Sequence, residues 1–186
     1  GTLALTLALA LALALALALA LALALALTPG RALSLRATNG PSMETLLGIV
    51  MLALSLLAWG GQAIVWFAPA LGVKLGLSEA EADVEPAFWA DIRGEALWDF
   101  FTLWTLVVAA ILLLLGHDAW PYFGLVGGGT YVYFAGRGIF TRRAMRKRGL
   151  RIGAPQSVRV GLSFLYIWGA LGLTTIFAAA RALHGH

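Results

Sequence analysis

Long apolar stretches alternate with short polar segments along the chain after residue 42. A helix that crosses a bilayer needs about 20 apolar residues, because each residue adds about 1.5 Å. Four stretches reach this length, at about 46–68, 97–116, 121–140 and 158–180. The pattern therefore predicts an all-α fold, an integral membrane bundle of four transmembrane helices.

The polar segments between these spans differ in length and charge. Residues 117–121 form a short turn, so the second and third spans should form an antiparallel hairpin. Segment 71–95 is acidic, and the sequence Ser-Glu-Ala-Glu at residues 78–81 has the pattern of a capping box. This box predicts a short surface helix that Pro86 would end. Segment 137–157 is basic.

The distribution of basic residues predicts the orientation. Four spans place the loops 71–95 and 137–157 on one side of the membrane. With the adjoining helix ends, that side holds ten of the 13 Lys and Arg residues. The positive-inside rule makes it cytoplasmic, which predicts a multi-pass protein of the inner (cytoplasmic) membrane.

Leu and Ala alternate from Leu7 to Leu27, and as a helix this run would span about 31 Å. If this run is translated and inserted into the membrane, it forms a fifth, N-terminal transmembrane helix. Such regular repetition lacks the side-chain variety that specifies packing, so upstream translation or an artefact is the interpretation we favour, with Met43 as the natural start. We accordingly divide the chain into a low-complexity segment and linker at 1–42 and a transmembrane domain at 43–186.

Composition narrows the function classes. The chain is 61% hydrophobic and only 12% charged, and it has no cysteine. It lacks Walker-type, HExxH and GxSxG motifs, so no cofactor is expected and enzymatic activity is not favoured. The formal charge of +4 comes from basic residues beside apolar spans, which argues for membrane topology rather than nucleic-acid binding.

Polar residues at the predicted cytoplasmic helix ends form a candidate ion or proton site. Glu95 and Asp99 are four residues apart and share a helix face. A carboxylate within the bilayer is costly unless it is paired. The candidate site consists of Gln62, Glu95, Asp99 and Arg159, with Arg137 in the same layer. The favoured alternative is structural, with both carboxylates complementing the helix dipole and pairing with Arg93 or Arg159.

Two glycine-rich sequences are open to two interpretations. Gly60-Gly61-Gln62 interrupts the first span, and residues 127–129 are three consecutive glycines. Broken helices of this kind occur in transporters. The favoured alternative is close helix packing, because Gly124 and Gly128 have the GxxxG spacing.

The basic segment carries a candidate contact for anionic lipids, since each charge near an anionic surface contributes about 1 kcal/mol. Its residues are Arg142, Arg143, Arg146, Lys147, Arg148 and Arg151. A purely topological role, or contact with the acidic loop on the same side, are the alternatives.

The sequences at residues 88–99 and 119–129 resemble those of small uncharacterised bacterial multi-pass membrane proteins. Residues 91–94, Asp-Ile-Arg-Gly, and the turn at 116–121 also resemble, over about a dozen positions, small subunits of multisubunit cation/proton antiporters. The resemblance to the antiporter subunits implies handling of cations or protons.

We expect a small membrane protein with an accessory, assembly or structural role. The alternative is a subunit or small transporter that handles protons or cations near Asp99, Glu95 and Gln62. The expected partners are the lipid bilayer, anionic lipids and other membrane subunits.

Overall fold

The computed structural model describes residues 42–184. Its elements are α3 (Met43–Phe67), α4 (Pro69–Lys74), η1 (Glu81–Asp83), α5 (Pro86–Thr102), α6 (Trp104–Leu115), α7 (Trp120–Lys147) and α8 (Pro155–His184). The Leu-Ala run lies outside the described residues, and with it the prediction of a fifth helix. The all-α prediction is confirmed, since the described residues contain helices and no strand.

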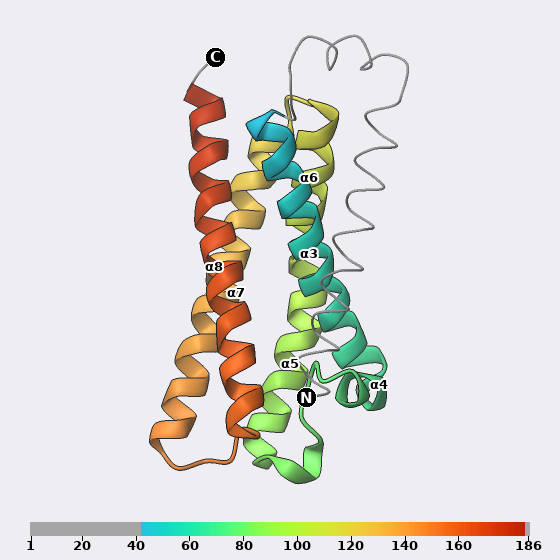
Figure 1. Cartoon of the computed structure of the whole chain (residues 1–186), viewed down its shortest axis with the longest axis vertical. Helices are drawn as coiled ribbons and strands as arrows, with labels where there is room; N and C mark the ends of the chain where they lie inside the picture. The colour runs from blue at the N-terminus through green and yellow to red at the C-terminus, as the bar shows by residue number, and fades with distance from the viewer. Residues whose placement is uncertain (1–41, 185–186) are drawn as a thin grey trace.

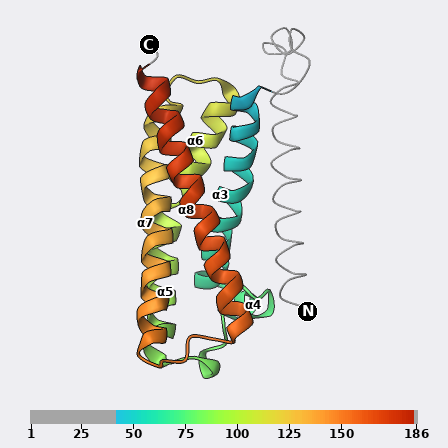
Figure 2. The ribbon, with the colours of Figure 1, turned by 60° about the vertical axis from the view of Figure 1, so that its left-hand side comes forward.

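The long helices run side by side along the longest axis of the molecule (Figures 1 and 2). α5 and α6 follow one another in a single rod, α7 packs most extensively against α8, and α3 packs against α5 and α6. Three helices are long and apolar enough to cross a membrane: Met43–Phe67, Pro86–Leu115 and Pro155–His184. α7 is of similar length, but its many Gly and Tyr residues make it less apolar.

The second span begins earlier than predicted. Pro86 is at the first turn of α5 and begins the helix, where its fixed φ and missing N–H are tolerated. The prediction that Pro86 ends a surface helix is therefore wrong. The expected capping box is also absent: residues 81–83 form one 3-10 turn without a side-chain cap. The acidic loop is consequently shorter than 71–95, because its last part is helical.

The third helix also extends beyond its predicted end at residue 140. α7 continues to Lys147, so much of the predicted loop 137–157 is helical. The short connection to α8 contains Gly149 and Gly153, whose φ angles of 74° and 115° favour glycine. Both connections are shorter than the predicted loops, and both lie at the same end of the bundle, as predicted (Figure 1).

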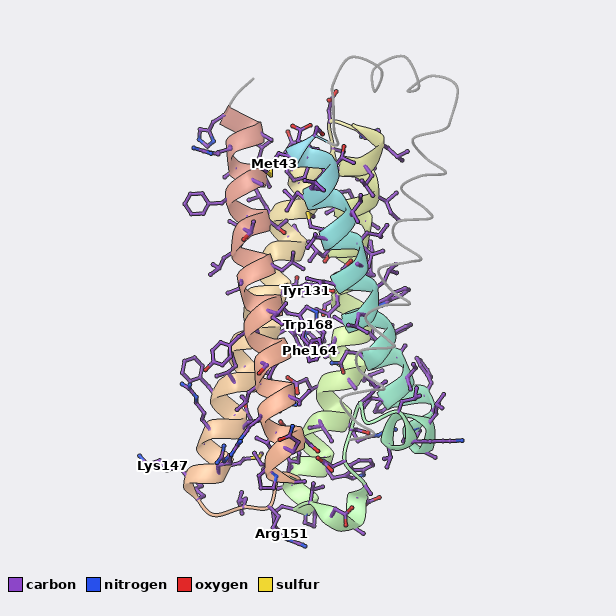
Figure 3. All side chains as sticks on the ribbon, viewed as in Figure 1. Met43, Tyr131, Lys147, Arg151, Phe164 and Trp168 are labelled. Atoms are coloured by element: carbon purple, nitrogen blue, oxygen red, sulfur yellow. The ribbon has the colours of Figure 1, made fainter. Side chains whose placement is uncertain are left out.

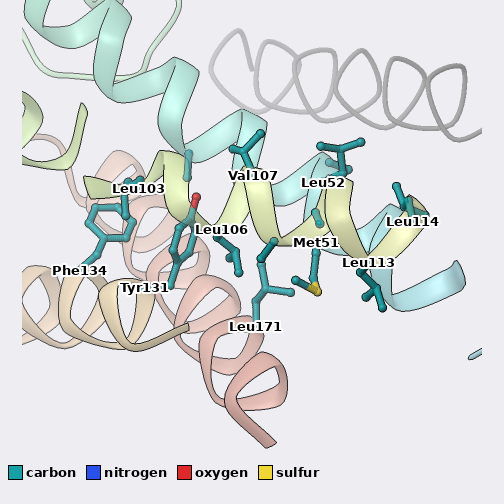
Figure 4. Packing of buried hydrophobic residues seen from close by; sticks show 14 of the residues in the cluster. Met51, Leu52, Leu103, Leu106, Val107, Leu113, Leu114, Tyr131, Phe134 and Leu171 are labelled. Carbon is teal, nitrogen blue, oxygen red and sulfur yellow. The ribbon is translucent and has the colours of Figure 1, made fainter. Parts of the chain in front are cut away.

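Polar side chains tie the helices together inside an apolar core. The Tyr131 hydroxyl donates to the Ser55 carbonyl at 3.1 Å, and Trp168 Nε1 donates to the Leu54 carbonyl at 3.1 Å. Figure 4 shows Tyr131 of α7 beside Leu103, at the junction of α5 and α6. Tyr131 and Leu103 are fully buried. These contacts fix α3 to α7 and α8.

The glycines of α7 allow close backbone approach. A Cβ atom on Gly127 would lie 2.7 Å from the Leu106 backbone nitrogen, and one on Gly128 would lie 2.8 Å from the Gly172 carbonyl oxygen. Helix packing is thus the role of these glycines, as favoured. The alternative of a helix break at residues 60–62 is excluded, because α3 is continuous there. Close packing is not found at Gly60 and Gly61, since a Cβ atom on either would have no neighbour within 4 Å.

Candidate functional site

Three acidic residues line one face of α5. Asp91, Glu95 and Asp99 are spaced four residues apart, so they stand above one another over about 12 Å of helix. Glu95 and Asp99 are 8% and 2% exposed. Charged groups this deeply buried are costly unless opposite charges lie nearby.

Two arginines of α7 face these carboxylates. Arg137 Nη2 lies 2.5 Å from Asp91 Oδ1, and Arg137 Nη1 lies 2.7 Å from Glu95 Oε1. Arg142 Nη1 lies 3.9 Å from Glu95 Oε2, and it also donates to the Gly138 carbonyl at 3.2 Å. The two helices are therefore joined by a charge cluster, which we define as Asp91, Glu95, Asp99, Arg137 and Arg142.

Asp99 is the member of the cluster without an ion pair. No cationic nitrogen lies within 4.0 Å of it among the described residues, and its buried Oδ2 has no hydrogen-bond partner there. The cluster holds three carboxyl groups and two guanidinium groups. Its formal net charge is −1 when every group is ionised.

The sequence predicted only some members of this cluster. Glu95, Asp99 and Arg137 were expected in one layer, and the structure brings Glu95 and Arg137 together. Arg159 is exposed and forms no ion pair in residues 42–184, so it is not the partner of either carboxylate. Asp91 was missed, although its four-residue spacing from Glu95 was a usable signal.

Arg93, the other predicted partner, is occupied elsewhere. It donates to the carbonyls of Val65 and Trp66 at the end of α3. Its guanidinium carbon also lies 4.6 Å from the centre of the Trp66 ring. Arg93 thus satisfies the last carbonyls of a helix, while the acidic residues beside it in sequence face α7.

A cavity of about 180 Å³ adjoins the cluster. Its walls come from α3, the α4–η1 connection, α5, α7, the α7–α8 connection and α8. Gln62 lines the cavity, as do Glu95 and Arg142 of the cluster, whereas Asp99 does not. Gln62 is therefore connected to the predicted site through the cavity.

The basic residues predicted to contact lipid, between positions 142 and 151, are exposed at the same end of the bundle, except Arg142, which is directed to Glu95. Figure 3 shows Lys147 and Arg151 at this end. The exposed side chains are Arg143, Arg146, Lys147, Arg148 and Arg151. Arg151 Nε lies 3.4 Å from Glu85 Oε1, and its carbonyl accepts from the Glu85 amide at 2.8 Å. Contact with the acidic segment, one of the alternatives for the basic residues, is therefore present at Arg142–Glu95 and at Arg151–Glu85.

No protein family, curated protein sequence or solved structure matches the chain. In the described part of the chain, no group of three or more His, Asp or Glu side chains is arranged to hold a metal ion.

Proposed function

We propose that the chain is a four-span membrane protein that handles protons or cations at its charge cluster. The observation that carries the proposal is the imbalance of the cluster: Asp99 is buried, lacks an ion pair within the described residues, and adds a third carboxyl group to two guanidinium groups. A proton or monovalent cation at Asp99 balances the charge. An ionisable residue in this setting is a functional-site hypothesis with a physical reason.

α7 is the fourth span in this proposal. It contains no charged residue from Trp120 to Gly136, and it packs against both α6 and α8. Its 28 residues extend about 42 Å, which exceeds the roughly 30 Å of a bilayer core. Arg137 and Arg142 would then lie near one membrane interface, on the charged side of the span.

The charged end of the bundle is cytoplasmic in this proposal, which places the protein in the inner membrane. The α3–α5 and α7–α8 connections meet there, together with ten of the 13 Lys and Arg residues of the chain. Basic residues beside spans are retained on the cytoplasmic side. The exposed residues at the end of α7 would meet anionic lipid head groups of that leaflet.

The test of the proposed activity is ion flux in proteoliposomes. Asp99→Asn keeps the size of the side chain and removes its charge, and we expect it to abolish proton or Na⁺ flux. Asp118→Asn is the matched control, because Asp118 is exposed in the turn before α7 at the opposite end. Size-exclusion chromatography of each variant establishes that the protein still assembles. Undiminished flux with Asp99→Asn contradicts the proposal.

An accessory or assembly role is the second candidate. The observation that favours it is that Arg137 already pairs with both Asp91 and Glu95, as in a cluster that only holds helices together. Purification from native membranes after mild solubilisation distinguishes the candidates. Stoichiometric membrane subunits in the purified material, with no flux from the chain alone, support the accessory role.

A further inference from the structure

The cavity beside the charge cluster has polar groups that nothing in the described chain satisfies. Ser78 Oγ and Glu79 Oε1 are buried and have no hydrogen-bond partner among residues 42–184, and both residues line the cavity. Leaving such groups desolvated and unpaired costs free energy. Water or another polar or charged occupant of the cavity would satisfy these atoms.

Gly153 positions the Glu79 carboxylate. A Cβ atom on Gly153 would lie 2.6 Å from Glu79 Oε1, so the carboxylate packs directly against the backbone of the α7–α8 connection. The φ angle of 115° at Gly153 is one that glycine adopts readily. The loop thus holds Glu79 at the edge of the cavity, although no ion pair to Glu79 occurs in the described chain.

The charges of the cavity wall favour a cation. Glu79, Glu95 and Arg142 are its charged lining residues. Arg142 is directed to Glu95 at 3.9 Å and to the Gly138 carbonyl, so its charge is already engaged. Glu79 remains as the uncompensated carboxylate of the wall.

Aromatic rings decide which kind of cation fits. Phe134, Phe164 and Trp168 line the same cavity, and so does Phe88, whose ring centre lies 5.8 Å from the Arg142 guanidinium carbon. Figure 3 shows Phe164 and Trp168 on α8 near the middle of the bundle. Small inorganic cations such as Ca²⁺ require six or more oxygen ligands. Glu95 is already paired with Arg137, and the other side chains of the wall that carry oxygen are Gln62, Ser78, Glu79 and Ser157. Alkylammonium groups, in contrast, bind favourably to aromatic faces.

We propose that the cavity binds a small organic cation, a tertiary or quaternary ammonium compound, with Glu79 as counter-ion and the aromatic rings as walls. The cavity volume of about 180 Å³ equals roughly six water molecules at about 30 Å³ each. The cavity therefore has room for a compound as large as choline. This site does not depend on the cation handling at Asp99, because Asp99 does not line the cavity.

The experiment compares choline with its uncharged isostere 3,3-dimethyl-1-butanol. Both are titrated calorimetrically into the whole protein in phosphatidylglycerol nanodiscs. We expect choline to bind about tenfold more tightly or better, since a desolvated cation–π contact and a carboxylate each favour the charged compound. Equal affinity for the two compounds, or no binding of choline, overturns the proposal.

Variants assign the binding to the cavity. Glu79→Gln should remove the preference for choline, whereas Glu81→Gln, at an exposed carboxylate outside the cavity wall, should preserve it. Phe164→Leu keeps an apolar wall without an aromatic face, so it should weaken choline binding and leave the alcohol unaffected. A preference that survives Glu79→Gln contradicts the proposed counter-ion.

The lipid composition of the nanodiscs distinguishes a lipid head group from a free compound as the source of the ammonium group. If nanodiscs of phosphatidylcholine lower the affinity for free choline, the natural occupant is a lipid head group. If the affinity is unchanged, it is a free compound, and both results support the ammonium site. Flux through Asp99 is measured separately, so loss of choline binding with flux intact rejects this site alone.

Discussion

Arg137 Nη1 lies 2.7 Å from Glu95 Oε1, across the interface between α7 and α5. Removing the guanidinium leaves a carboxylate that is 8% exposed without its nearest counter-charge. Arg137→Gln should therefore lower the free energy of unfolding by about 2–4 kcal/mol, somewhat less than for a fully buried pair. Thermal unfolding in detergent measures the loss.

Arg146→Gln is the matched control for this prediction, because Arg146 is an exposed arginine of the same helix. It should change stability by less than about 0.5 kcal/mol. The double variant Glu95→Gln with Arg137→Gln should lose less than the sum of the single losses, since each single change leaves one unpaired charge. Strict additivity of the two changes would contradict a coupled pair.

Two adjacent glycines of α7 should respond oppositely to the same substitution. A Cβ atom on Gly128 would meet Ile176 Cγ1 at 2.7 Å, whereas one on Gly129 has no neighbour within 4 Å. Gly128→Ala should destabilise the bundle by about 1–3 kcal/mol through overpacking. Gly129→Ala should be neutral or stabilising by up to about 1 kcal/mol. Equal unfolding temperatures would contradict close packing at Gly128.

The buried hydroxyl of Tyr131 provides a third test of the core. It donates to the Ser55 carbonyl at 3.1 Å, and Tyr131 is fully buried. Tyr131→Phe should cost about 1–2 kcal/mol, because it leaves a buried carbonyl without that donor. Tyr133→Phe, at a side chain that is 57% exposed, should have almost no effect on unfolding.

Membrane topology can be mapped with single cysteines, because the chain has none of its own. Arg148→Cys and Asp118→Cys place thiols at exposed positions beyond opposite ends of α7. In intact cells, a membrane-impermeant maleimide should label position 118 and not position 148. Labelling of both thiols from outside would show that α7 does not cross the membrane.

The exposed basic end of α7 should retain anionic lipid. Replacing Arg146, Lys147 and Arg148 together by Gln removes three exposed charges, at about 1 kcal/mol each near an anionic surface. Native mass spectrometry should then detect less bound phosphatidylglycerol, with phosphatidylcholine unchanged. Arg142→Gln is the comparison, because Arg142 is directed to Glu95 and should not affect retained lipid.

The sequence predicted the helical class of the fold because apolar length is a local property. It did not predict the start of α5, because the segment from Pro86 to Leu97 contains acidic residues that looked like a surface loop. Their burial depends on Arg137 and Arg142, which lie more than 40 positions later. These contacts join distant segments, and hydropathy does not record them.

The candidate site was predicted in part for the same reason. Glu95 and Asp99 share a helix face by their spacing, which the sequence shows directly. The sequence does not show which arginine contacts them, because this depends on the orientation of α7 and α8 about their own axes relative to α5. Arg159 is exposed on α8, while Arg137 of α7 makes the contact. The cavity joins residues from several elements, and no pattern within one element indicates it.

The uneven distribution of charge along the bundle has an electrical consequence. Beyond Asp99, α6 and the first part of α7 contain no charged residue. In a membrane, this apolar half acts as the insulating layer across which the voltage falls. A cation entering the cluster from the charged end crosses little of the field. One that continues to the other side crosses most of it, at about 2.3 kcal/mol per charge for each 100 mV.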